Sequence, residues 1–387
     1  MSQRCLFDKI VNAPTVFTDE TVFCADYLPE ELPGRHDQLQ ELFGMFRSVI
    51  RSPKKAHQEV VVQGPIGSGK TTLIRYFMDA ILQFTKASAD GQFAAVHINC
   101  RKMNRPIPLL TTIIQSTVDP YFPTRGFSPD ELLQALVTRY SNLGIHLILC
   151  LDEFEYLLAD KAGKDLLYSL LRFHDDNFTR KMRLSIILVT RSSSLQSILD
   201  ATMFSTLSGK TLAVNGYIAS QLEEILHHRA KMGIRHGVVG PEIFTTIAQR
   251  IAQQGGDARI AIELLWRAGK RADRLGDSTI KQRHLGESYL AKTTSVSASS
   301  PASDLSIHER FLLQALRAGL KTARTRRITM GQLKKHYNAV CTKKGETPRH
   351  HTQLWKLIGN LRHKKLLISE VGPHPEKRGR TTLLQLP

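Results

Sequence analysis

A glycine-rich segment from Gly64 to Thr71 has the residue types and spacing of a phosphate-binding loop. It reads GPIGSGKT and fits the pattern G-x-x-x-x-G-K-[ST] at every fixed position. Glycines let backbone N–H groups approach phosphate oxygens, the Lys reaches the β- and γ-phosphates, and the Thr hydroxyl is a ligand for Mg²⁺. We therefore predict that ATP or ADP binds here with Mg²⁺, through Gly64, Pro65, Gly67, Ser68, Gly69, Lys70, Thr71 and Thr72.

Two acidic residues directly follow the apolar run IHLILCL at 145–151. A loop of this kind needs a carboxylate at the end of a neighbouring strand to hold the metal and its water shell. Asp152 is placed for this role, so Thr71 and Asp152 form the predicted metal site. We predict that Glu153 acts as the base that orients an attacking water. An acidic helix start would be the ordinary structural explanation of the same pair.

The segments around these motifs alternate between strand and helix patterns. A short apolar run precedes the loop and a helical pattern follows it. The segment 129–144 has the pattern of an amphipathic helix that ends on Gly144. Further strand-like runs are found at 93–100, 145–151 and 184–190. This alternation predicts an α/β domain with a parallel sheet that helices cover on both faces.

The C-terminal segment is strongly basic. Residues 305–387 contain 18 Lys and Arg against 4 Asp and Glu, a net charge of +14 out of +18 for the whole chain. Three helical patterns, at 306–319, 329–345 and 348–365, precede a hairpin, and together they predict a winged helix. We therefore expect double-stranded DNA as the partner of this segment. A solvated basic surface without a partner is the structural alternative.

Composition shifts divide the chain into parts. We expect a nucleotide-binding domain with an N-terminal arm at 1–213, a helical lid at 214–292, a polar linker at 293–304 and the winged helix at 305–387. No apolar run is long enough to span a bilayer, and the five cysteines include no C-x-x-C pair. We expect a cytoplasmic, nucleoid-associated protein with no membrane partner.

The order of the motifs resembles that of a known family. DYLPEELPGRHDQLQEL at 26–42, the P-loop, LDEFEYLL, GDARIAIELL at 256–265 and the winged helix occur in the order found in archaeal replication initiators. These are AAA+ ATPases related to eukaryotic origin-recognition-complex and cell-division-control proteins. The resemblance covers about residues 15–387. It implies an AAA+ domain, a lid and a winged helix that binds origin DNA, with a replicative ring helicase and other initiator copies as partners.

The resemblance also implies roles for single residues. Arg259 matches a lid cation that reaches the γ-phosphate; by itself it would be a surface arginine at a helix start. The YLPEELPGR segment would surround the adenine, although its residues alone indicate only an extended, proline-marked loop. The residues implied near the base are Tyr27, Leu28, Leu32, Pro33 and Arg35.

The sequence departs from the family pattern in ways that fit a divergent paralogue. The strand SIILVT usually ends in an Asn that positions the attacking water, and here Arg191 stands near that place. Arg only donates hydrogen bonds, whereas Asn also accepts them. A commonly present Arg that acts on a neighbour's nucleotide is replaced by Thr202, and such an arginine supplies several powers of ten in rate. We expect intact binding and a weak ATPase, with Arg191 as a candidate catalytic residue. A third departure, VNGY at 214–217, has no interpretation from the sequence.

The winged helix supplies two groups of candidate DNA contacts. Most basic side chains on the recognition helix (348–364) and the wing (372–380) are expected to touch phosphate, which positions the protein without reading sequence. These are Arg349, Arg362, Lys377, Arg378 and Arg380. Thr352, Gln353 and Lys356 are candidates for base edges. Trp355 is predicted to lie in the core with Leu354, Leu357, Ile358 and Leu361, and a wedge that stacks on a base is the alternative.

The function predicted from the sequence is an ATP-dependent DNA replication initiator, with ATP binding and slow hydrolysis as a switch. A nucleotide-gated DNA-binding regulator with little or no turnover is the first alternative, and the missing Asn and Arg modestly favour it. A transposition-type or defence ATPase is a third hypothesis, which the YLPEELPGR segment disfavours.

Overall fold

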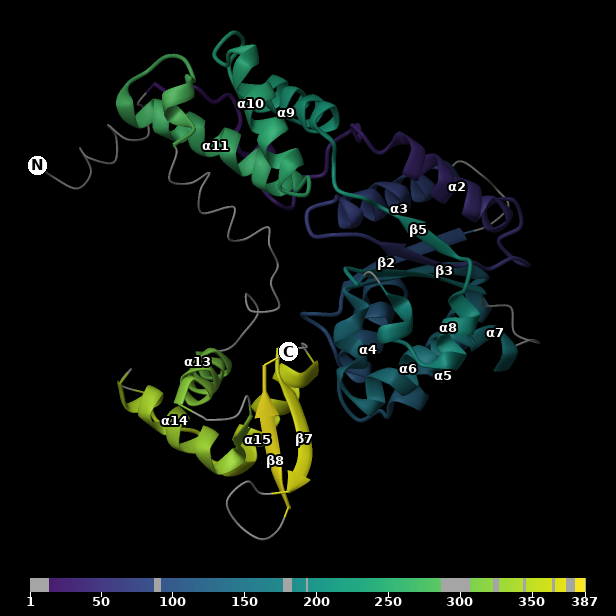
Figure 1. The fold of residues 1–387 in the computed structure, drawn as a ribbon. Helices are drawn as coiled ribbons and strands as arrows, with labels where there is room; N and C mark the ends of the chain where they lie inside the picture. The colour runs from purple at the N-terminus through teal and green to yellow at the C-terminus, as the bar shows by residue number, and fades with distance from the viewer. Residues whose placement is uncertain are drawn as a thin grey trace, which may run out of the picture. The chain divides into compact units, whose positions relative to one another are not determined.

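The computed structural model describes residues 14–86, 92–176, 183–192, 194–286, 307–322, 327–343, 346–363, 366–373 and 380–386. The chain divides into two compact units, Met1–Tyr289 and Leu290–Pro387 (Figure 1). Each unit is described by itself. Among the described residues, none of the helices has the length and hydropathy needed to cross a bilayer.

The first unit is built on a five-stranded parallel sheet. Its strands lie in the order β2-β3-β4-β1-β5, so the strand before the P-loop and the strand before Asp152 are separated by one strand, β4. Parallel pairing brings the carboxyl ends of all the strands to one edge, and Asp152 is in register with Asn99 and Val189 there. The strands are β1 (Glu59–Gln63), β2 (Gln92–Asn99), β3 (Ile145–Asp152), β4 (Arg183–Thr190) and β5 (Thr211–Ala213).

Helices cover both faces of this sheet, as the sequence predicts (Figure 1). Successive strand residues alternate between two cores: Leu149 packs with the helices of one face and Ile148 with those of the other. One face carries α2 (His36–Arg51) and α3 (Lys70–Lys86). The other carries α4 (Pro106–Thr117), α5 (Pro129–Leu143), α6 (Lys161–Leu171), α7 (Phe173–Asp176) and α8 (Ala201–Leu207).

A lid of three helices completes the first unit. These are α9 (Ala219–Gly233), α10 (Pro241–Gln253) and α11 (Ala258–Leu275), followed by the short η4 (Gln282–His284). The N-terminal arm, which includes η1 (Glu20–Phe23), lies against this lid. The Val16 N–H donates to Asp273 Oδ1 at 2.7 Å, and the Thr18 N–H donates to the Gly233 carbonyl at 3.0 Å. The arm thereby fastens the segment just ahead of Tyr27 to the lid.

The second unit is a winged helix. Its helices are α13 (Ile307–Thr322), α14 (Met330–Lys343) and α15 (His351–His363), and its antiparallel sheet has the order β6-β8-β7. The strands are β6 (Ile328–Thr329), β7 (Ile368–Pro373) and β8 (Arg380–Gln385). Leu312, Leu333 and Tyr337 meet Leu354 and Ile358 in the core. The three helices and the hairpin were predicted, whereas the two-residue β6 was not.

Candidate nucleotide site and DNA interface

The P-loop runs from β1 into α3 and uses glycine where no other residue fits. Gly67 and Gly69 have φ angles of 71° and 81°, in the left-handed region that glycine adopts without strain. A Cβ on Gly69 would collide with the Tyr217 hydroxyl, and a Cβ on Gly64 would collide with the Val214 carbonyl oxygen. The loop is therefore held tightly by the chain that leads from the sheet to the lid.

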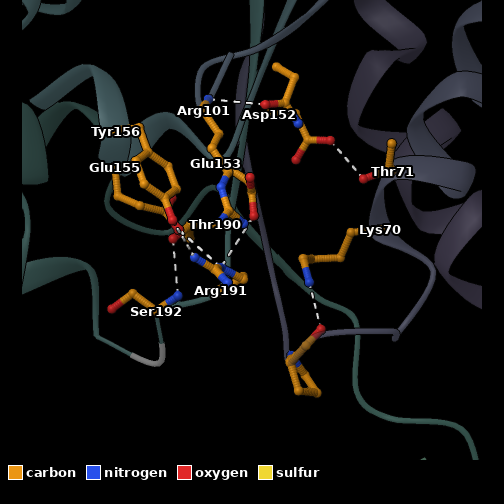
Figure 2. A network of polar contacts seen from close by, with 12 residues as sticks. Lys70, Thr71, Arg101, Asp152, Glu153, Glu155, Tyr156, Thr190, Arg191 and Ser192 are labelled. Atoms are coloured by element: carbon orange, nitrogen blue, oxygen red, sulfur yellow. Dashed lines mark hydrogen bonds and ion pairs between the residues drawn. The ribbon is translucent and has the colours of Figure 1, made fainter. Parts of the chain in front are cut away.

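Lys70 is folded back onto the loop (Figure 2). Its Nζ donates to the carbonyl oxygens of Gly64 at 2.8 Å and Pro65 at 2.6 Å. The pKa of Lys70 is lowered to about 8, mainly by burial and also by the charges of Arg259 and Arg191, although the charge of Asp152 opposes the shift. An anion held by the loop would favour the charged ammonium.

Thr71 and Asp152 meet at the position predicted for a metal. The Thr71 hydroxyl donates to Asp152 Oδ2 at 2.7 Å, and His97 Nε2 lies 3.2 Å from the same oxygen. Burial would raise the pKa of Asp152, but the hydrogen bonds from His97 and Thr71 and the charges of His97 and Lys70 outweigh it and lower the pKa. A charged carboxylate beside a hydroxyl offers the hard oxygen ligands that Mg²⁺ prefers, so the pair fits this metal.

Arg191 and the acidic segment after β3 form one network (Figure 2). Arg191 Nε lies 3.4 Å from Glu153 Oε1 and 3.6 Å from Glu155 Oε1, and its NH2 donates to the Tyr156 hydroxyl at 3.1 Å. Burial alone would lower the pKa of Arg191, but the charges of Glu153 and Glu155 outweigh it and raise the pKa. Two groups that the sequence predicts as separate catalytic candidates are therefore joined as an ion pair.

The backbone of Glu153 is strained. Its φ of 55° is the one positive value at a non-glycine residue within the described part of the chain. Such a conformation costs about 1 kcal/mol or more, and surrounding packing must maintain it. Buried Phe154 and Leu157 in η2 (Phe154–Ala159) supply that packing and hold Glu153 at the carboxyl edge of the sheet.

A cavity of about 380 Å³ lies between the P-loop and the lid. The lid touches the loop directly, because the Ala258 N–H donates to the Gly67 carbonyl at 3.1 Å. Asp257 accepts a hydrogen bond from the Arg259 N–H at 2.9 Å and fills the space that a Cβ on Gly67 would need. The predicted site residues on the cavity wall are Tyr27, Leu28, Leu32, Pro33, Gly67, Gly69, Lys70, Thr71, Thr72 and Arg259.

Arg35, which the resemblance associates with the base, contacts the P-loop backbone. Its side chain is buried, and its Nε and NH2 donate to the Ser68 carbonyl at 3.1 Å and 2.8 Å. NH2 also donates to the Asn215 carbonyl at 2.5 Å, and the guanidinium lies 3.8 Å from the centre of the Tyr217 ring. Arg35 is absent from the residues that line the cavity, as are Gly64, Pro65 and Ser68.

Several further residues line the cavity, among them two to which the sequence analysis gave no role. Arg229 is buried in α9, donates to the Val22 carbonyl at 2.6 Å and lies 4.4 Å from the centre of the Tyr27 ring. Tyr217 belongs to the unexplained VNGY segment, and its N–H donates to the Gly256 carbonyl at 3.0 Å. The sequence does contain a signal for Arg229, because this arginine interrupts the apolar helical pattern of residues 222–230.

In the second unit, the described DNA candidates other than Arg380 lie on α15 or just before it. Gln353, Lys356 and Arg362 are exposed on this helix, and Arg349 is exposed just before it. Thr352 belongs to α15 and Arg380 begins β8, while Lys377 and Arg378 lie outside the described residues. The core prediction for Trp355 is wrong: its side chain is 38% exposed, because it lies off the stripe that Leu354, Ile358 and Leu361 bury.

Known families match three successive parts of the chain. The matches are an AAA domain at residues 54–199, a Cdc6 AAA+ ATPase-type lid domain at 223–289 and a CDC6 C-terminal winged helix domain at 302–387. ORC1-type DNA replication protein 2 of Saccharolobus solfataricus is 27% identical over 385 residues, which cover 98% of this chain and 92% of the relative.

Two solved structures share the whole architecture. The Aeropyrum pernix ORC1 protein in complex with DNA is 24% identical, with a TM-score of 0.69 and coverage of 96% of this chain and 93% of that one. Cdc6p from Pyrobaculum aerophilum is 26% identical, with a TM-score of 0.62 and coverage of 96% and 94%. With its AAA+ domain, Cdc6-type lid and winged helix, this chain belongs to the Orc1/Cdc6 family and is a homologue of the archaeal ORC1-type DNA replication proteins.

Proposed function

We propose that this chain is a nucleotide-gated DNA replication initiator. It binds ATP or ADP with Mg²⁺ between the P-loop and the lid, and it binds origin duplex DNA through the winged helix. The observation that carries the proposal is that Lys70, Thr71 and Arg259 line one cavity, although they come from the sheet edge and from the lid.

The nucleotide site works by charge and position. Backbone N–H groups of the P-loop and the N-terminus of α3 hold the phosphates, and the Lys70 ammonium neutralises them. Thr71 and Asp152 would hold Mg²⁺, which supplies further neutralisation of phosphate charge when bound. Arg259 extends from the lid toward the same cavity and would report whether a third phosphate is present. Tyr27, Leu28, Leu32 and Pro33 line the same cavity and would enclose the base.

Gating follows from how the chain is fastened on both sides of the cavity. Residues before Tyr27 are bound to the lid, through Asp273 and Gly233. Residues after Pro33 are bound to the P-loop, through Arg35 and Ser68. A nucleotide in the cavity therefore contacts the lid, the loop and the strap between them, so different nucleotide states favour different lid positions.

Slow hydrolysis follows from the ion pair between Arg191 and Glu153. A carboxylate oxygen that is held by a guanidinium is less available to accept a hydrogen bond from an attacking water. We propose that the site acts as a timed switch instead of a fast motor. The same ion pair favours the second candidate function, a nucleotide-gated regulator without useful turnover, and measured turnover separates the two.

The winged helix is the part of the chain that we propose binds duplex DNA. Its net charge of +14, the exposed Lys356 and Arg362 on α15, and the DNA complex of the Aeropyrum pernix relative support duplex binding. Other copies of the chain and a replicative ring helicase are the protein partners that we propose, with action at the nucleoid in the cytoplasm.

Matched variants test the two sites separately. Lys70→Ala should abolish binding of a fluorescent ATP analogue and leave basal affinity for duplex DNA unchanged. Charge reversal at Lys377 and Arg378 should weaken duplex binding at low salt, reduce its salt dependence and leave nucleotide affinity unchanged. Nucleotide binding by Lys70→Ala at wild-type affinity would overturn the first assignment. Wild-type duplex binding by the wing variant would overturn the second.

A further inference from the structure

The solvent side of α15 carries two stripes of residues that differ in chemistry. The buried side is occupied by Leu354, Ile358 and Leu361, which pack into the core of the winged helix. Leu357 is partly buried against the same core, and helical spacing places the other described positions in two rows that run along the helix. One row is polar and consists of the exposed Gln353, Lys356 and Asn360. The other, which we call the notch stripe, consists of Trp355, Gly359 and Arg362.

Gly359 has no structural requirement for glycine within the described part of the second unit. It lies inside α15 and does not have a positive φ angle. A Cβ built on it would meet no described heavy atom within 4 Å. Glycine weakens a helix interior relative to alanine, because it loses more backbone freedom on folding. A bare backbone at an open position lets an external group approach the helix closely, which is a role that alanine would impair.

The neighbours of Gly359 indicate what approaches it. Trp355 lies one turn before it and is 38% exposed, and Arg362 lies nearly one turn after it and is exposed. The notch stripe therefore joins an apolar aromatic surface, a gap and a cation along one flank of the helix. The basic segment around it, with a net charge of +14, selects a polyanion as the occupant.

We propose that the notch stripe contacts the sugar–phosphate backbone of duplex DNA: Trp355 packs on a deoxyribose, Gly359 admits the strand, and Arg362 pairs with a phosphate. The polar stripe of Gln353, Lys356 and Asn360 faces the base edges. This inference rests on the proposed function, in which α15 enters a groove of duplex DNA, and it assigns the two flanks of the helix to different parts of the groove.

The dimensions of the groove explain why one flank needs a gap. The major groove of B-form DNA is about 12 Å wide, and a helix with its side chains is about 10–12 Å across. The flank of an inserted helix therefore lies against a groove wall, which is sugar and phosphate. Removing one side chain where the wall is nearest lets the aromatic ring before it and the cation after it both reach the strand. Contacts of this kind add affinity without reading sequence.

A glycine pair in the chain provides a matched test of the gap. Gly44 lies inside α2 of the first unit, and a Cβ on it would also meet nothing within 4 Å. Gly44→Ala and Gly359→Ala should each raise the melting temperature slightly, because alanine stabilises both helix interiors. Only Gly359→Ala should weaken duplex binding, by about tenfold and to a similar extent for different sequences. A binding loss in a stabilised variant excludes misfolding as its cause. Equal binding by Gly359→Ala and wild type would overturn the gap assignment.

Salt dependence separates the roles of Trp355 and Arg362. Trp355→Ala should weaken binding by about tenfold without changing the slope of the logarithm of affinity against the logarithm of salt concentration. Trp355→Phe should recover most of that loss. Arg362→Gln should reduce the magnitude of the slope by about 0.9, the amount expected for one phosphate contact. Unchanged affinity in Trp355→Ala, or an unchanged slope in Arg362→Gln, would overturn the assignment of that residue.

Fluorescence reports the contact directly, because the chain contains two tryptophans, Trp266 and Trp355. In the Trp266→Phe variant, duplex DNA should change the emission of Trp355, and in Trp355→Phe the emission should stay constant. Unchanged emission from Trp266→Phe at saturating duplex would overturn the aromatic contact while DNA binding itself stands. If the wild-type protein binds no duplex in any nucleotide state, both the proposed function and this inference are overturned.

Discussion

Arg191 Nε lies 3.4 Å from Glu153 Oε1, where β4 and β3 end side by side. Glu153, the carboxylate that we propose as the base that orients a water, is thereby paired with a cation. A second carboxylate, Glu155, lies 3.6 Å from the same nitrogen and helps to keep Arg191 in place. The slow turnover in our proposal has its physical origin in this pair.

Replacing Arg191 should release the base. Arg191→Asn removes the cation and supplies a group that both donates and accepts hydrogen bonds, so we expect ATP turnover to rise by about tenfold. Initial rates of phosphate release measure this, and Glu153→Gln provides the background in both the wild-type and Arg191→Asn proteins. A rate that falls to this background would mean that Arg191 promotes hydrolysis instead of restraining it.

Arg35 should be required for the shape of the P-loop. Arg35→Ala leaves the buried carbonyl of Ser68 and the carbonyl of the exposed Asn215 without these hydrogen bonds. Hydrogen bonds to a charged group contribute about 1.5–3 kcal/mol, so both the melting temperature and nucleotide affinity should fall. Arg35→Lys should recover little, because an ammonium cannot reproduce the planar contacts to two carbonyls. Unchanged nucleotide affinity in Arg35→Ala would contradict this role.

The packing of Gly69 against Tyr217 predicts a compensating pair. Gly69→Ala should destabilise the protein through its φ of 81° and through collision with the Tyr217 hydroxyl. Adding Tyr217→Phe should recover the part caused by the hydroxyl. Gly126, with a φ of 92° and open space around it, is the control for the backbone cost alone. The melting temperatures of Gly69→Ala, Tyr217→Phe, the double variant and Gly126→Ala separate the backbone cost from the cost of the collision. If the effects of Gly69→Ala and Tyr217→Phe simply add in the double variant, the contact is contradicted.

Buried His146 predicts a loss of stability in acid. Its Nδ1 lies 2.7 Å from the Pro53 carbonyl and its Nε2 lies 2.9 Å from Ser185 Oγ. Burial and, to a smaller extent, the nearby charges of His174, His57 and Arg183 lower the pKa of His146 from 6.5 to about 4, although the hydrogen bond with Pro53 opposes this shift. Between these values the unfolded chain binds the proton and the folded chain does not, so stability falls as the pH decreases through this window.

Substitution isolates the contribution of His146. The difference between about 4 and 6.5 corresponds to at most about 3 kcal/mol. His146→Gln should therefore lose less thermal stability than the wild type between pH 7 and pH 4.5. The exposed His236→Gln should behave like the wild type. If all three proteins lose the same thermal stability between pH 7 and pH 4.5, His146 does not cause the loss of stability in this pH range.

The parts of the fold that the sequence predicts are those in which local residues decide the structure. Helix α5 has a capping box of Ser128 and Glu131 and ends on Gly144 in the left-handed conformation, so its bounds follow from nearby residues. The P-loop is likewise contiguous. β5 and β6 contain three and two residues, too few to show an alternating pattern, and they form because partners distant in the chain pair with them.

The relationships that tertiary packing creates could not be predicted. The pairing of Arg191 with Glu153 depends on β4 lying beside β3. The exposure of Trp355 depends on Leu354, Ile358 and Leu361 already filling the core side of α15. The support of Ser68 by Arg35 depends on how the YLPEELPGR segment packs against the P-loop. Each of these relationships depends on how segments that are far apart in the sequence pack together, and local sequence patterns do not show this.

The affinity for origin-containing duplex DNA in the presence of ATP, of ADP and of no nucleotide tests the central claim most directly. Allosteric coupling typically changes affinity by about 5- to 150-fold, and we expect a difference in this range between nucleotide states for the wild type. Lys70→Ala should show one affinity under all three conditions. Identical wild-type affinities at saturating nucleotide would contradict nucleotide gating and leave the P-loop without a role in DNA binding.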